Sequence, residues 1–184
     1  LTDVDSANLT SLTVTLMARP DGNAVESLAL NAAAATAATT AGLTVSYTAG
    51  TGVLSITGSA TKAVYQSILQ GVLYNDTSDT PTTTNRSINV VANDGVTASA
   101  TQTVTLTVAA VNDTPVNTVP GAQTVNEDTA LAIPGISVMD VDGNLSTVQL
   151  GVANGTVTVS LVGGATITGG ANGTATLTLS GTQA

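Results

Sequence analysis

The stretch Leu12-Thr13-Val14-Thr15-Leu16-Met17 alternates apolar side chains with threonine and methionine. A period of two places Leu12, Val14 and Leu16 on one face of an extended strand. One face then packs against a core and the other meets water, which is typical of antiparallel sheets, because parallel strands are usually apolar on both faces. The stretch predicts an all-β fold.

The same alternation recurs along both halves of the chain. Turn signals lie between the runs, among them Asp21-Gly22 and Asn93-Asp94-Gly95. Regularly spaced short strands with turns between them predict an antiparallel β-sandwich. The further runs cover residues 88–92, 104–108, 131–133, 157–161 and 175–179.

One segment has helical instead of strand periodicity. Residues 61–70 place Tyr65 and Ile68 on one side of a helix, with Thr61 able to cap its start and Gly71 placed to end it. We expect one short helix that crosses between sheets. Residues 32–40 are rich in alanine but have no apolar stripe, and an inserted loop is the prediction there.

Two landmarks occur twice, which indicates an internal repeat. The acidic triplet Asp3-Val4-Asp5 recurs 137 residues later as Asp140-Val141-Asp142, and residues 54–60 recur 123 residues later from Leu177. A linker, Val111-Asn112-Asp113-Thr114-Pro115, separates the copies. The chain is therefore expected to hold residues 1–113 as a sandwich lacking its first strands, and residues 114–184 as the N-terminal part of the next.

Neither predicted sandwich is complete, so each would leave an unpaired sheet edge. The missing strands are expected from flanking sequence or from another chain.

Composition narrows the function. The chain has 12 carboxylates against 3 basic residues, a net charge of −9, and no His, Cys, Trp or Phe. This charge disfavours binding to nucleic acid or to an anionic membrane surface, and no apolar run approaches the roughly 20 residues of a membrane span. Without His or an aromatic-lined groove, an enzyme is not expected.

The order of these motifs resembles the cadherin-like tandem repeats of large bacterial surface adhesins. The elements that carry the resemblance are Asn126-Glu127-Asp128, the second acidic triplet, Asn93-Asp94-Gly95 and the Asn-Asp-x-Pro linker. It extends over essentially the whole chain. It implies Greek-key, cadherin- or immunoglobulin-like sandwiches repeated end to end, calcium at each junction, and an extracellular or cell-surface location.

The resemblance also implies where the metal ligands lie. The internal junction would use Asn112 and Asp113 from the linker with Asp140 and Asp142, and a contribution from Asp76. At Asp76 the family has an Asp-Arg-Glu type segment, whereas this chain reads Tyr-Asn-Asp-Thr. The remaining expected ligands are Asp3, Asp5 and Asp94 at the far end of the first module, and Glu127 at the opposite end of the second.

The charge pattern also points to calcium. Ten of the twelve acidic residues are Asp, and most occupy predicted turns or linkers. Calcium takes about 6–8 oxygen ligands and needs neither imidazole nor thiolate. The alternative is that these aspartates only accept hydrogen bonds from backbone N–H groups in turns, a reading that stays open for Asp76 and Asp94. Asp21 and Asp79 are expected in ordinary loops.

The function predicted from the sequence is a structural repeat of a long adhesin or matrix fibre, stiffened by calcium between modules. Its expected partners are neighbouring copies of the module and, in a fibre, other chains. Two alternatives remain: a fibre subunit that assembles by strand donation, and a calcium-dependent ligand-binding adhesin module.

Overall fold

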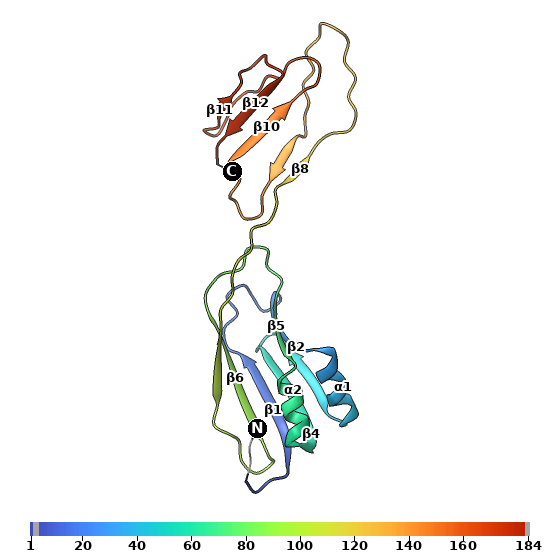
Figure 1. The fold of residues 1–184 in the computed structure, drawn as a ribbon, viewed down its shortest axis with the longest axis vertical. Helices are drawn as coiled ribbons and strands as arrows, with labels where there is room; N and C mark the ends of the chain where they lie inside the picture. Colours follow the sequence, from blue (N-terminus) through green and yellow to red (C-terminus); the bar gives the residue numbers. More distant parts are fainter. Residues whose placement is uncertain (2–3, 183–184) are drawn as a thin grey trace. The chain divides into compact units, whose positions relative to one another are not determined.

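The computed structural model describes residue 1 and residues 4–182. The chain divides into two compact units, unit 1 (Leu1–Ala110) and unit 2 (Val111–Ala184). The regular structure of both is mainly antiparallel strand, with two short helices in unit 1 (Figure 1).

Unit 1 contains a five-stranded antiparallel sheet and a separate two-stranded one. Residues 12–16 of the alternating stretch quoted above lie in the central strand β1 (Asn8–Leu16), which pairs with β4 (Val53–Thr61) on one side and with β6 (Arg86–Asn93) on the other. The strands of the larger sheet, in spatial order, are β3 (Thr44–Thr48), β4 (Val53–Thr61), β1 (Asn8–Leu16), β6 (Arg86–Asn93) and β7 (Gln102–Leu106). The smaller sheet pairs β2 (Glu26–Leu30) with β5 (Val72–Asp76).

The predicted helix is present as α2 (Lys62–Leu69). The Thr61 side chain accepts a hydrogen bond from the backbone N–H of Val64, so it caps the helix as expected. Gly71 follows the last turn for a different reason than the one predicted. A Cβ atom there would lie 2.4 Å from the Cβ of Ala34, so glycine is needed for close packing against the neighbouring helix.

That neighbouring helix corrects the loop predicted for residues 32–40, because Ala32–Thr40 forms a second helix, α1. Asn31 caps its start by accepting from the backbone N–H of Ala34, and Ala34 and Ala38 are buried. The loop was predicted because the segment has no apolar stripe. Alanine nevertheless has high helix propensity, and its small side chain is sufficient where α1 packs on α2.

The core of unit 1 lies against one face of the five-stranded sheet. Alternate residues of β1 are buried, and α2 contacts both β1 and β4. The large side chains with the least exposure in this core are Leu12, Val14, Leu16, Leu28, Leu54, Ile56, Tyr65 and Ile68.

Unit 2 contains a three-stranded antiparallel sheet and a two-stranded one. In the larger sheet β10 (Thr147–Gly151) and β11 (Thr166–Gly169) lie on either side of β12 (Thr176–Ser180). The smaller sheet pairs β8 (Val116–Thr118) with β9 (Ser137–Met139).

The sheet β10-β12-β11 of unit 2 repeats the order β1-β4-β3 of unit 1. Across β1 and β4, Val14 opposes Leu54, and across β10 and β12, Leu150 opposes Leu177. From the acidic triplet to this pair, unit 1 has one residue more than unit 2. The register of β1 and β4 is irregular between Leu9 and Ser11, where the extra residue belongs to β4. The repeat seen in the sequence is therefore a repeat of three-dimensional structure.

Two predicted strands of the second copy are not formed. Residues 131–133 carry no regular structure, and residues 157–161 make only an isolated bridge between Val157 and Thr174. The counterpart of residues 157–161 in unit 1 is β2, whose ladder partner is β5. The described part of unit 2 holds no counterpart of β5, so alternation of side chains alone does not produce a strand there.

Candidate functional site

Four of the five residues predicted at the internal junction, Asn112, Asp113, Asp140 and Asp142, come together within unit 2, whereas Asp76 lies in unit 1. Asp140 is buried, and its Oδ1 accepts a hydrogen bond from the backbone N–H of Asp142 at 3.0 Å. The Asp142 carboxylate accepts from the backbone N–H of Asp113 at 2.6 Å. Asn112 accepts through its side-chain oxygen from the side-chain amide of Asn144. The linker is thus fastened to the acidic turn that precedes β10.

Asn144 is the member of this group that the sequence did not reveal. It lies two residues after the acidic triplet, and this closeness was the signal that the sequence offered. The group offers oxygen ligands from Asn112, Asp113, Asp140 and Asp142, which is the donor type that calcium prefers. We call these four residues with Asn144 the junction cluster.

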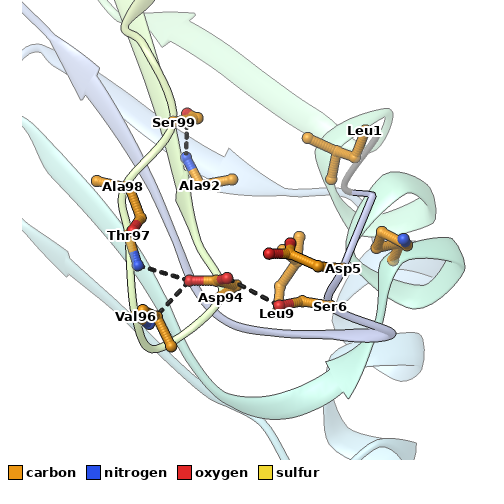
Figure 2. A pocket seen from close by; sticks show the side chains of 11 residues that line it. Leu1, Asp5, Ser6, Leu9, Ala92, Asp94, Val96, Thr97, Ala98 and Ser99 are labelled. Atoms are coloured by element: carbon orange, nitrogen blue, oxygen red, sulfur yellow. Dashed lines mark hydrogen bonds between the residues drawn. The ribbon is translucent and has the colours of Figure 1, made fainter.

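A second predicted group lies at one end of unit 1. Asp5 and Asp94 line the same pocket of about 490 Å³, and Figure 2 shows both carboxylates directed into it. Asp94 Oδ1 accepts from the backbone N–H groups of Thr97 at 2.7 Å and Val96 at 2.8 Å, and its Oδ2 accepts from Ser6 Oγ at 2.8 Å.

The hydrogen bonds from Thr97, Val96 and Ser6 lower the pKa of Asp94 to about 2. Asp94 is therefore ionised at neutral pH and acts as the cap of the turn that follows β6, as the turn reading predicted. Asp3, expected beside Asp5, lies outside the described residues.

Asp76 lies in unit 1 in a third group, with Asp21, Glu26 and Arg86. Oxygens of the three carboxylates lie within 4.8 Å of one another, the only such acidic group among the residues that the structure describes. Such a group could hold a metal ion. Here the buried Arg86 guanidinium lies among the carboxylates, with Nε 2.9 Å from Glu26 Oε2 and Nη2 3.3 Å from Asp76 Oδ2. We call these four residues the arginine cluster.

Hydrogen bonds within the arginine cluster satisfy its charges. Tyr74 Oη donates to Glu26 at 2.7 Å, and the backbone N–H of Asp21 donates to the other Glu26 oxygen at 2.8 Å. Burial opposes ionisation of Glu26, but the bonds from Arg86, Asp21 and Tyr74 outweigh it and lower its pKa. The guanidinium thus supplies the positive charge that a metal ion would bring.

Asp21 lies in a loop, as predicted, but its carboxylate has a structural role that the prediction did not include. Its carboxylate pairs with Arg86 and accepts from the backbone N–H of Thr82 at 3.0 Å, and the bond from Thr82 is the largest cause that lowers its pKa. The sequence carried a signal for the cluster, since Arg86 is in phase with the apolar Ile88 and Val90. A charge on the apolar face of a strand requires a buried partner.

Glu127, the remaining predicted ligand, is exposed in the loop between β8 and β9. Its backbone carbonyl accepts from the Thr129 hydroxyl at 3.3 Å. The structure gives no metal role to this side chain, and that role stays a prediction.

Comparison of the chain with protein-family models, with curated proteins and with solved structures finds no match. Neither helix in the described part of the chain has the length and apolar character needed to span a membrane.

Proposed function

We propose that this chain is a structural segment of tandem Greek-key, cadherin-like β-sandwich modules, located in a long extracellular fibre or adhesin. In this proposal calcium binds at the junction cluster and fixes the angle between successive modules.

The observation that carries the proposal is the attachment of the linker to the acidic turn. Asp113 donates its N–H to Asp142, and the side chains of Asn112 and Asn144 are hydrogen bonded. Residues on both sides of β8 and β9 in the sequence therefore meet at the end of unit 2 from which the linker leaves. A cation bound there contacts linker and module at once, and bending the linker would break ligand bonds.

The donor set supports calcium over a softer metal. Asn112, Asp113, Asp140 and Asp142 offer only oxygen, and the chain has no His or Cys. The 74 residues of unit 2 carry five acidic side chains and no Lys or Arg. No basic side chain of unit 2 competes with a cation for these carboxylates, in contrast to the arginine cluster.

The repeat supports a spacer over an enzyme. Unit 2 presents an acidic triplet before β10, and the sequence presents the same triplet before β1. Asp94 has a pKa of about 2, and the pKa of Glu26 is also lowered, so neither carboxyl group is poised to exchange a proton at neutral pH. Repetition of one module suits a load-bearing role, which we expect for a protein outside the cell.

The test combines calorimetry with small-angle X-ray scattering on the full chain, with calcium and with EGTA. If free calcium is 100 times the dissociation constant, one site adds about 2.7 kcal/mol of stability. We expect calcium to raise the melting temperature of unit 2. In the scattering experiment we expect the chain to be longer and less variable in shape with calcium than with EGTA. Superimposable profiles and melting curves in calcium and in EGTA would refute the proposal.

A further inference from the structure

Unit 2 contains an apolar groove that its own residues leave open. The cavity has a volume of about 570 Å³ and lies against the inner face of the sheet formed by β10 and β12. Ile133 and Ile136 on its wall are 50% and 45% exposed, far more than isoleucine in a core. The apolar residues that line the groove include Ile133, Ile136, Val148, Leu150, Val157 and Leu179.

Unit 1 shows what covers the equivalent surface. The pair Leu12 and Ile56 across β1 and β4 corresponds to Val148 and Leu179 across β10 and β12. Leu12 and Ile56 are fully buried, because α2 contacts both of their strands and packs Tyr65 and Ile68 into the same core. Val148 and Leu179 are only half-buried. No helix covers this pair in the described part of unit 2.

Two strands show the same difference. In unit 1, β2 forms its ladder with β5, and β1 pairs with β6 as well as with β4. In the described part of unit 2, residues 157–161 have no ladder, and β10 pairs with β12 alone. The groove thus adjoins one segment able to accept a β5-type strand and one edge able to accept a β6-type strand.

We propose that the groove of unit 2 binds a second copy of the chain's own Lys62–Asn93 sequence pattern, a helix followed by two strands. The helix places a Tyr and an Ile on Val148, Leu150 and Leu179. Its first strand pairs with residues 157–161, and its second strand pairs with the open edge of β10.

Charge and sequence register agree with this occupant. Residues 62–93 contain Lys62 and Arg86 against Asp76 and Asp79, so their formal charges cancel. Such a segment approaches the acidic unit 2 without net repulsion. In unit 1 α2 directly follows β4, and β12 is the counterpart of β4, so the proposed helix follows β12 in the same register.

The experiment extends the full chain with a copy of residues 62–106 directly after Ala184. Hydrogen exchange of residues 157–161, binding of the dye ANS and sedimentation are compared with those of the original chain. We expect exchange at residues 157–161 to slow at least about tenfold, ANS fluorescence of unit 2 to fall, and the extended chain to remain a monomer. The matched control carries Tyr65→Asp and Ile68→Asp in the added copy only, and we expect it to behave like the original chain.

Unchanged exchange and ANS fluorescence in the extended chain would overturn the proposal. So would an original chain that sediments as a dimer with residues 157–161 already protected, because the groove would then belong to self-association. Amide protection of β1 and β4 monitors unit 1 in every variant. All measurements are made in EGTA, so their failure leaves the calcium proposal unaffected, and the reverse also holds.

Discussion

Glu26 and Arg86 bury their charges against each other: Oε2 of Glu26 lies 2.9 Å from Nε of Arg86, and neither side chain is exposed to solvent. The pair joins β2 of the small sheet to β6 of the large one. Because the two strands belong to different sheets, this ion pair fastens the layers of unit 1 to each other.

Removing the guanidinium is expected to destabilise unit 1 strongly. Arg86→Met leaves the carboxylates of Asp21, Glu26 and Asp76 close together without a counter-charge, and breaking a buried pair in this way costs about 3–5 kcal/mol. Urea unfolding followed by tyrosine fluorescence measures the loss, since Tyr47, Tyr65 and Tyr74 all lie in unit 1.

The matched control for Arg86→Met is Asp79→Asn, which neutralises an exposed acidic side chain and is expected to change stability by less than about 0.5 kcal/mol. Equal effects of the two substitutions would contradict a structural role for the arginine cluster.

The stability of unit 1 is expected to fall in acid. The pKa values of Asp21 and Glu26 are lowered in the folded chain, mainly by the backbone N–H of Thr82 for Asp21 and by Arg86 for Glu26. A lowered carboxyl pKa stabilises the fold above the ordinary value of about 4, and this contribution is lost as the pH falls through the lowered value. The melting temperature of unit 1, followed by tyrosine fluorescence, should therefore change little between pH 7 and about 5 and fall steeply below about 4.

Glu26→Gln removes one of these titrating groups, so its melting temperature should depend less on pH in the acid range. A variant whose acid profile runs parallel to that of the original chain would show that Glu26 does not contribute.

Gly71 is expected to tolerate no side chain. A Cβ atom at this position would meet Ala34 Cβ at 2.4 Å and Asn31 Oδ1 at 2.8 Å. Gly71→Ala therefore has to separate α1 from the end of α2, at a cost of about 1–3 kcal/mol for overpacking. Gly50→Ala is the control, because a Cβ atom there meets nothing within 4 Å. Equal melting temperatures of Gly71→Ala and Gly50→Ala would show that the contact is easily relaxed.

Calcium binding at the junction cluster is expected to depend on Asp142. Asp142→Asn removes a charge that faces the linker through the Asp113 N–H, and it should abolish the calcium-dependent rise in the melting temperature of unit 2. Asp79→Asn also removes one negative charge but lies in unit 1, and it should leave that rise intact. Isothermal titration calorimetry measures the calcium affinity of both variants. Equal calcium affinity in the two variants would exclude Asp142 as a ligand.

Predictions from the sequence were correct for features that depend on residues close together in the chain. Side-chain alternation in β1 depends on the two-residue period of a strand, and the Thr61 cap depends on a hydrogen bond three residues along the chain. Likewise, Asp94 caps the turn that its Asn-Asp-Gly context indicated. The prediction failed for α1, where buried alanines replaced the expected apolar stripe.

The sequence by itself determined the antiparallel β character, the internal repeat and the acidic turns, because each is written in neighbouring residues or in a recurring motif. Only the tertiary structure decided that Arg86 meets three carboxylates from β2, β5 and a loop, 10 to 65 residues away in the chain. It also decided that residues 157–161 form no ladder although they alternate correctly. The physical reason is common to both cases: a buried charge and a strand each need a partner, and the partner's position is fixed by how the chain folds back on itself.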